Sequence, residues 1–193
     1  MGLKQKTCKS CRQRFAPSRP MQSACSPACA IAIAERKREK QAQQMAAEKR
    51  RETRQRLEAV KSRADWLREA QTAVNRYVRL RDRDNGCISC DRPATWDGQW
   101  HASHFRSVGA ASAVRFNLWN IHKACSVCNH HLSGNVAGYM PRLIEKVGPE
   151  KVEWLQQQNQ IVRYEIEYLK RLKSVFNRRA NRVAKTQTIN RWR

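Results

Sequence analysis

Apolar side chains are unevenly distributed along the chain, and their spacing divides it into segments of different kinds. Residues 31–63 contain almost no large apolar side chains, no Gly and no Pro, and consist mainly of Ala, Gln, Glu, Lys and Arg. These residues favour helix, so we expect a long helix without a buried face. It is either a solvated spacer or a basic arm that lies along a nucleic-acid backbone.

A second helical segment follows, and this one has an apolar face. From Trp66 to Val78 the apolar residues recur three or four positions apart, which predicts an amphipathic helix from Asp65 to about Arg83. Asn85-Gly86 is a turn signal that ends the helix. The apolar face indicates that this helix packs against the module that follows it.

The last apolar stripe begins after Gly148-Pro149. We expect a helix there with heptad-like apolar spacing and with Asn159 and Lys173 as polar breaks; its apolar residues are Val152, Leu155, Val162, Ile166, Leu169 and Phe176. The stripe either packs within its own chain, against the Trp66 helix, or forms the seam of a two-stranded homodimer. No acidic residue follows Glu167, so the tail should fray and bind phosphates without reading sequence.

Between the two apolar helices the pattern predicts short strands. Asp97-Gly98 lies among aromatic residues and predicts a β-hairpin, with His101 and His104 on or just past its second strand. A helix is then expected to start between Asn129 and Asn135. Two strands and a helix in this order would form a ββα unit.

The eight cysteines fall into four close pairs, which favours two zinc sites in a reducing compartment over disulfides. Each site would have four thiolate ligands, Cys8, Cys11, Cys25 and Cys29 in the first and Cys87, Cys90, Cys125 and Cys128 in the second. The segment around the first site is too short to bury a useful core, so a zinc ion would supply its folding free energy. Ser26 as N-cap and Pro27 in the first turn predict that a helix carrying Cys29 starts there.

The charge of the chain indicates a polyanionic partner. The 193 residues include 39 Lys and Arg against 16 Asp and Glu, which gives a net charge of +23. Nucleic acid is the first candidate. An anionic membrane surface is the second, although residues 31–63 lack the apolar face that interfacial binding needs. No apolar run approaches the roughly 18 residues that span a bilayer, and no signal peptide precedes the first cysteine, so we expect a cytoplasmic protein that binds no membrane.

All five histidines, with several amides, lie between Trp100 and Leu132, within and just after the insert of the second cysteine cluster. A structural zinc ribbon needs no histidines in that insert. The collection therefore predicts a second, open metal site of the kind that cuts phosphodiesters.

The order of these motifs is similar to that of a known nuclease class. His104, Asn120 and Cys125-x2-Cys128-Asn129 resemble the HNH (ββα-Me) signature in its zinc-stapled form. A longer set of segments resembles the NinG (Rap) family of phage recombination proteins, namely Arg81-Asp82-Arg83-Asp84, Cys87-Ile88-Ser89-Cys90, Asn120-Ile121-His122-Lys123, Cys128-Asn129 and Ser133-Gly134-Asn135. That resemblance implies a structure-specific DNA endonuclease acting on branched recombination intermediates, such as Holliday junctions or D-loops, in the cytoplasm of a bacterial host. His101 departs from the family pattern, which has an Asp at this position.

The resemblance and the chemistry of phosphodiester hydrolysis suggest a role for each site residue. A neutral imidazole can take the proton of the attacking water, and we assign His104 as that general base. Asn120 is expected to fix the loop that holds His104, by bonding backbone groups. His101 and Asn129 are the leading ligands of a catalytic ion, with His131 as a third ligand or a phosphate contact. The ion would be Mg²⁺ or Mn²⁺ if oxygen ligands dominate, and Zn²⁺ or another transition metal if imidazoles do.

Basic residues near the site and in the tail are the candidate nucleic-acid contacts, and they are Arg106, Lys123, Arg178, Arg179 and Arg182. Such side chains bind phosphates by charge. His122 and His130 are interpreted instead as structural residues that form hydrogen bonds.

Taken together, the sequence predicts a predominantly helical α+β protein with a zinc-stapled ββα-metal (HNH-like) core. Its expected segments are a four-cysteine zinc knuckle (1–30), a basic helical arm (31–64), a nuclease module (65–147) and a C-terminal helix with a basic tail (148–193). Branched DNA is the expected partner, and a homodimer would suit paired cuts. The competing hypothesis is a non-catalytic zinc protein that binds nucleic acid or acts as a recombination adaptor, for which His101 is the best support.

Overall fold

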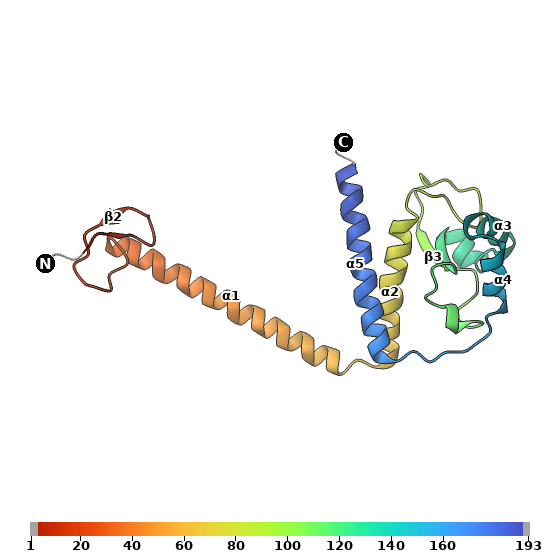
Figure 1. Ribbon diagram of the computed structural model, residues 1–193, viewed down its shortest axis with the longest axis horizontal. Coiled ribbons are helices and arrows are strands. Elements are labelled where there is room, and N and C mark those ends of the chain that lie inside the picture. The colour runs from red at the N-terminus through yellow and green to blue at the C-terminus, as the bar shows by residue number, and fades with distance from the viewer. Residues whose placement is uncertain (1–3, 191–193) are drawn as a thin grey trace. The chain divides into compact units, whose positions relative to one another are not determined.

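The computed structural model describes residues 4–190, with side chains through residue 186. The chain forms two compact units, one ending at Val60 and one beginning at Lys61 (Figure 1). The elements in chain order are β1 (Lys6–Thr7), β2 (Arg14–Phe15), α1 (Pro27–Ala59), α2 (Arg63–Arg81), β3 (Trp100–His104), η1 (Ser112–Val114), β4 (Ile121–Cys125), η2 (Val127–His131), α3 (Val136–Val147), α4 (Pro149–Gln157) and α5 (Ile166–Asn190). The prediction of a mostly helical α+β protein is confirmed. None of the described helices is both long and apolar enough to cross a membrane.

The first unit consists of a small knuckle and the helix that leaves it. β1 and β2 pair antiparallel, and the Ser26 hydroxyl accepts a hydrogen bond from the Cys29 backbone N–H at 3.2 Å, with Pro27 in the first turn. The expected helix start is therefore confirmed. α1 has no buried residue, as its composition predicted, but it ends at Ala59 rather than near residue 63.

α2 begins with a capping box that the sequence analysis overlooked. The Ser62 hydroxyl accepts from the Asp65 backbone N–H at 3.2 Å, and the Asp65 carboxylate accepts from the Ser62 backbone N–H at 2.9 Å. Such reciprocal bonds satisfy two donors that would otherwise lack partners. The second unit therefore starts before residue 65, at the short break between α1 and α2.

The two strands of the second unit are not those that the Asp97-Gly98 turn predicted. β3 pairs antiparallel with β4, in register from Trp100 opposite Cys125 to His104 opposite Ile121. The segment before β3 folds back on the side chain of Trp96, so that a Cβ built on Gly98 would lie 2.2 Å from the Trp96 ring. That close approach leaves no room for a side chain at position 98 unless the Trp96 ring moves.

Side chains of β3 and β4 alternate between two apolar cores. On one face, Ala102 and Ile121 pack with the apolar stripe of α2 and with Leu169 and Phe176 of α5. On the other face, Phe105 and Ala124 pack with cysteines of the second cluster and with α3 and α4. The hairpin is thus sandwiched between helices on both sides (Figure 1).

The stripe from Val152 to Phe176 does not form one helix. Residues 158–165 are extended between α4 and α5, where the Val162 backbone N–H donates to the Ser112 hydroxyl at 2.6 Å and the Tyr164 hydroxyl donates to the Ser112 carbonyl at 2.8 Å. These bonds tie the segment to η1 and interrupt the helix. α5 then continues to Asn190, where fraying was expected.

α5 packs against α2, which is the intramolecular alternative for the stripe. The rings of Tyr77 and Phe176 meet edge to face at 5.3 Å, and Lys173 Nζ lies 2.7 Å from the Glu69 carboxylate. Residues 65–147 and 148–193, which the sequence analysis separated, therefore belong to one unit.

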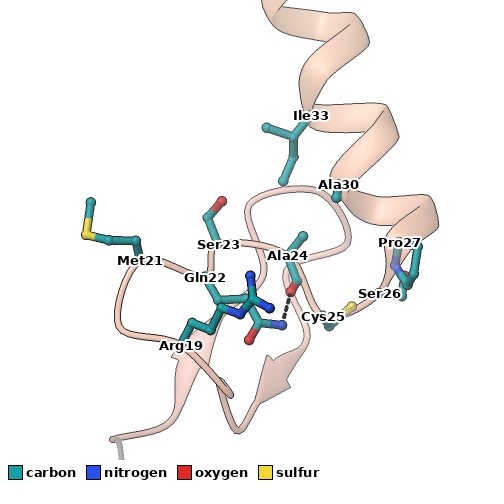
Figure 2. Close-up of a pocket in the computed structure, with 10 residues that line it drawn as sticks. All are labelled: Arg19, Met21, Gln22, Ser23, Ala24, Cys25, Ser26, Pro27, Ala30 and Ile33. Atoms are coloured by element: carbon teal, nitrogen blue, oxygen red, sulfur yellow. Dashed lines mark hydrogen bonds between the residues drawn. The ribbon is translucent and has the colours of Figure 1, made fainter.

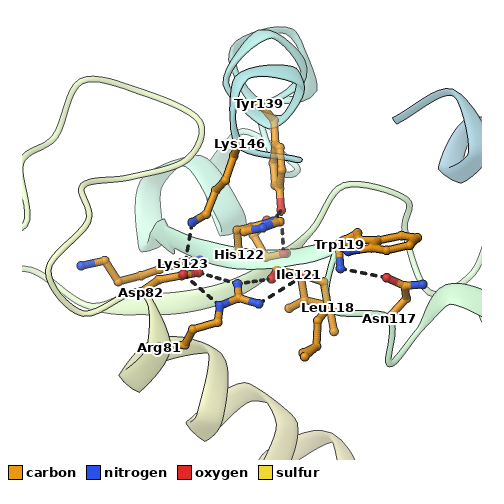
Figure 3. Close-up of polar contacts among 11 residues, drawn as sticks. Arg81, Asp82, Asn117, Leu118, Trp119, Ile121, His122, Lys123, Tyr139 and Lys146 are labelled. Carbon is orange, nitrogen blue, oxygen red and sulfur yellow. Dashed lines mark hydrogen bonds and ion pairs between the residues drawn. The ribbon is translucent and has the colours of Figure 1, made fainter. Parts of the chain in front are cut away.

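A buried carboxylate joins α2 to the hairpin and to α3 (Figure 3). Asp82 is 2% exposed and accepts hydrogen bonds from Arg81 at 2.6 Å, Lys146 at 3.1 Å and the Lys123 backbone N–H at 3.2 Å. Arg81 also donates to the Ile121 carbonyl at 2.8 Å. Burial by itself raises the pKa of Asp82, but the hydrogen bond and charge of Arg81, with the charge of Lys146, lower it to about 2.

Replacing this carboxylate should destabilise the second unit. Asp82→Asn leaves Arg81 and Lys146 without their buried counter-charge, so we expect a loss of about 3 kcal/mol in the free energy of unfolding. Urea denaturation at pH 7, with zinc present, measures this loss. The matched control is Asp84→Asn, since Asp84 is exposed and should change stability by less than about 0.5 kcal/mol. Equal effects of the two variants would show that the Asp82 network does not hold the unit together.

Candidate metal centres and active site

The second cysteine cluster has the geometry of a structural zinc site. The four sulfurs of Cys87, Cys90, Cys125 and Cys128 all lie within 4.8 Å of one another, with 3.8 Å between Cys90 and Cys125. A Zn–S bond of about 2.3 Å gives a tetrahedral edge of about 3.8 Å, so a zinc ion fits. Arg92 donates to the Cys90 and Cys125 sulfurs at 3.4 and 3.3 Å. Burial by itself raises the pKa of Cys90, but hydrogen bonds from Arg92 and Cys128 lower it to about 7.

The first cluster has a similar arrangement within the knuckle. The sulfurs of Cys8, Cys11, Cys25 and Cys29 also lie within 4.8 Å of one another, and Cys25 is 3.5 Å from Cys11 and 3.6 Å from Cys29. Figure 2 shows the hollow beside Cys25, which the loop from Arg19 and the first turns of α1 enclose. Both predicted four-cysteine sets are thus brought together, and each can hold zinc.

Four sulfur atoms this close together favour the binding of a cation. Hydrogen bonding to the sulfurs of Cys11 and Cys29 raises the pKa of Cys25 to about 12. Burial, followed by hydrogen bonding to the Cys90 and Cys125 sulfurs, raises the pKa of Cys128 to about 12. A divalent ion replaces the protons that such thiols retain at neutral pH.

Two of the predicted catalytic-metal ligands are in contact. The Asn129 side-chain amide lies 3.0 Å from His101 Nδ1. Asn129 belongs to η2, directly after the zinc ligand Cys128, so the zinc-bound turn positions its amide against β3. The helix expected from Asn129 onward is instead this one short π-helical turn. Residues 133–135 all have positive φ, and α3 begins only after them.

The Asn129 amide nitrogen donates to His101 Nδ1, so this imidazole lone pair and the amide oxygen would become metal ligands only where an ion replaces the hydrogen bond. Among the described residues, only the two cysteine clusters bring three or more His, Cys, Asp or Glu ligand atoms within 4.8 Å of one another. His131 therefore forms no such group with His101 and His130; it is exposed, and its ring centroid lies 5.4 Å from that of His130. A donor set of imidazole and amide without a carboxylate fits Mn²⁺ or a later transition metal better than Mg²⁺.

His104 lies on the other face of the hairpin from His101. Residues of a strand alternate in direction, and these two are three apart. His104 Nε2 is 3.0 Å from the Arg115 carbonyl, which can only accept, so Nε2 carries the proton and Nδ1 carries the lone pair. Burial lowers the pKa of His104, and this keeps the ring neutral at pH 7.

Asn120 clamps the loop that carries this carbonyl. It is fully buried; its side-chain oxygen accepts from the Arg106 backbone N–H at 2.7 Å, and its amide donates to the Arg106 and Val114 carbonyls, both at 3.1 Å. These are backbone bonds of the kind expected of Asn120. They hold the two ends of the segment from Arg106 to Val114 together, next to Arg115.

His122 has no open coordination position. It is 2% exposed, its Nδ1 lies 3.2 Å from the Tyr139 hydroxyl, and that hydroxyl donates to the Ser103 carbonyl at 3.2 Å (Figure 3). Burial, together with the charges of Lys146 and Arg81, lowers the pKa of His122 to about 3. The interpretation of His122 as a structural residue agrees with this placement.

The predicted nucleic-acid contacts differ in exposure. Arg178, Arg179 and Arg182 are exposed on α5. Arg106 is half-buried and donates to the Asn159 side chain at 2.6 Å. Lys123 is only 3% exposed, and its Nζ donates to the Arg83 carbonyl at 2.7 Å, so its ammonium group already has a partner within the protein.

Two features of the site were missed. The Arg115 carbonyl is a backbone group, and nothing in the sequence distinguishes it from other carbonyls. Arg76 and Arg79 could have been found from the sequence. They are three residues apart, so they share one face on the polar side of the Trp66 helix, whereas the prediction for this helix rested on its apolar side.

Metal analysis should find two zinc ions per chain. Cys128→Ser should lower this to one and destabilise the second unit, because structural zinc contributes on the order of 10 kcal/mol of apparent folding free energy. Cys29→Ser should also lower the count to one, but should leave the unfolding midpoint of the second unit unchanged. Elemental analysis by mass spectrometry, combined with thermal unfolding, separates the two variants. A parent protein that folds equally well after chelation would contradict both expectations.

Comparison with known proteins extends this picture. The family model described as "Bacteriophage Lambda NinG protein" matches residues 1–186. The protein ninG of Escherichia phage lambda is 38% identical over 187 residues, which cover 89% of this chain and 90% of that protein. The ninG proteins of Salmonella phage P22 and Enterobacteria phage H19B are 37% and 36% identical, each covering 89% of this chain and 90% of the relative. No solved structure matches the chain. Similarity of this extent places the chain in the NinG protein family of bacteriophages.

Proposed function

We propose that this protein is a metal-dependent DNA endonuclease of the HNH type that cuts branched recombination intermediates, such as Holliday junctions or D-loops. The observation that carries the proposal is the state of His104. Its ring is neutral and half-buried, and one nitrogen is fixed on a backbone carbonyl while the other keeps a lone pair. A general base for phosphodiester hydrolysis needs these properties.

The surroundings of His104 support this role. Asn120 holds the loop that supplies the Arg115 carbonyl, so the ring is oriented before substrate binds. A base that is already in place avoids the cost of ordering it during the reaction. In this role His104 Nδ1 accepts the proton of the attacking water, and Nε2 keeps its bond to Arg115.

His101 and Asn129 would hold the catalytic ion. When bound, such an ion neutralises the charge that develops on the leaving oxygen. The chain contributes by fixing Asn129 beside the zinc-bound turn and His101 on β3, at 3.0 Å from each other. Water and phosphate oxygens would complete the coordination.

Base and ion would act on one phosphodiester from opposite sides. In-line displacement places the attacking oxygen and the leaving oxygen on opposite sides of the phosphorus. His104 and His101 project from opposite faces of β3, so a DNA backbone lying across the unpaired edge of that strand could meet both. Exposed arginines of α5 would add contacts to the backbone.

The second candidate is a zinc protein that binds nucleic acid without cutting it. The observation that favours this candidate is the ligand pair itself. His101 stands where the family pattern has an Asp, and His101–Asn129 supplies two neutral ligands without a carboxylate. Neutral ligands hold a hard cation weakly.

Substitution of His104 distinguishes the two candidates. His104→Ala should lower the cleavage rate on a synthetic Holliday junction by about 10²- to 10⁴-fold, the usual contribution of a general base, and should leave the Kd for the junction unchanged. Single-turnover cleavage with Mg²⁺, Mn²⁺ or Zn²⁺ and a gel-shift assay measure the two effects. His130→Ala is the matched control, because His130 is an exposed histidine outside the proposed roles. A parent chain that cuts no junction with any of these ions would favour the second candidate.

The pH profile tests the same residue independently. Only the neutral imidazole accepts a proton, and burial lowers the pKa of His104 from its ordinary 6.5. The cleavage rate at saturating Mn²⁺ should therefore stay constant above pH 6.5 and fall, with unit slope on a logarithmic scale, only at lower pH. An inflection above pH 6.5 would indicate a different base.

A further inference from the structure

α2 borders a cleft with its polar side. A hollow of about 440 Å³ is lined by Arg76 and Arg79 of α2 and by Arg83 in the turn after that helix; opposite them lie Trp100 and Lys123 of the hairpin, with Ala94 and Ala184. This volume is within the range of sites that bind small molecules or single units of a polymer. Arg76 and Arg79 are three residues apart on the helix, so they lie on one face and present neighbouring guanidinium groups to the hollow.

Carboxylates pair only part of the charge of this cleft, since Arg83 lies 3.5 Å from the Asp84 carboxylate. In the part of the chain that the structure describes, neither Arg76 nor Arg79 forms a salt bridge with an acidic side chain. Arg76 instead donates to the neutral Asn181 side chain at 2.8 Å, and Arg79 is exposed. Like charges gathered in a concave, partly apolar site attract an anion more strongly than the same charges on an open surface.

Contacts within the protein position the walls of the cleft. Lys123 Nζ lies 4.0 Å from the centroid of the Trp100 ring, and Trp96 packs edge-on against Trp100 at 5.2 Å. Lys123 also donates to the Arg83 carbonyl at 2.7 Å. Because these side chains already have partners, binding of an anion would cost little conformational entropy in them.

The cleft adjoins the proposed metal site. Trp100 lines the cleft and directly precedes His101 on β3. A strand held in the cleft would thus continue toward His101 and Asn129.

We propose that this cleft holds the sugar–phosphate backbone of the DNA strand that reaches the His101–Asn129 pair, with Arg76 and Arg79 contacting its phosphates. The row of guanidinium groups suits successive phosphates, and the apolar surface of Leu80 and Trp100 suits the sugars between them. The inference takes the identity of the strand as substrate from the proposed function. Backbone binding in the cleft does not itself require cutting.

The salt dependence of DNA binding tests the cleft without cleavage. Each phosphate contact contributes about 0.7 (single strand) to 0.9 (duplex) to the slope of log Kd against log salt concentration. Arg76→Gln/Arg79→Gln should lower that slope by about 1.5 and weaken binding roughly tenfold near ~100 mM salt. Fluorescence anisotropy with labelled single-stranded and junction DNA, in EDTA-free buffer without added divalent ions, measures both quantities.

Controls separate the cleft from general charge and from folding. Lys151→Gln/Arg163→Gln removes the same charge from two exposed side chains of the unit outside α5 and should leave the slope within about 0.5 of the parent. Arg79→Lys keeps the charge and should restore most of the slope that Arg79→Gln loses, which a folding defect would not allow. An unchanged slope for Arg76→Gln/Arg79→Gln, or an equal loss in the Lys151/Arg163 variant, would overturn the cleft proposal.

The proposed nuclease function is judged by a different result. If the parent cuts junctions and the cleft variant binds like the parent, the cleft proposal fails alone. If the cleft variant loses slope but the parent never cuts, the nuclease proposal fails and the cleft remains a DNA-binding site of a non-catalytic protein.

Discussion

The cluster of four sulfurs at Cys87, Cys90, Cys125 and Cys128 is the constraint on which the second unit depends. Cys125 is the last residue of β4 and Cys128 lies in η2, so one ion bound to both fixes the angle between the strand and the turn. The Ile88 backbone N–H donates to the Lys123 carbonyl at 3.0 Å, which aligns the first pair of cysteines with β4. A turn held this tightly can present Asn129 to His101 although η2 is only one short turn.

Apolar packing brings α2 to the hairpin, and the Asp82 network fixes where along the hairpin it lies. An apolar stripe tolerates some sliding of a helix along a sheet, whereas bonds from Arg81 to the Leu118 and Ile121 carbonyls exist in only one position. The same position places Arg76 and Arg79 opposite Trp100. The buried ion pair of Arg81 and Asp82, drawn in Figure 3, thus also fixes which α2 side chains line the basic cleft.

Local signals in the sequence predicted much of this fold. The Ser26-Pro27 helix start, the amphipathic α2 and both cysteine sets depend on residues close in sequence or on fixed spacing, and all are found. Features that depend on distant partners were not predictable in the same way. The pairing of β3 with β4 and the interruption of the C-terminal stripe by bonds to Ser112 both arise from contacts across many residues.

The relation between His101 and His104 shows this limit at the site itself. Residues three apart share a face in a helix but lie on opposite faces of a strand, so a spacing alone does not say whether two histidines can meet. The strand conformation rules out one compact cluster of His101 and His104. The remaining arrangement has the two imidazoles on either side of the edge of β3, which pairs only with β4 among the described strands. Proteins commonly protect such edges from other chains, whereas the proposed nuclease function requires that a DNA backbone reach this edge between the two imidazoles.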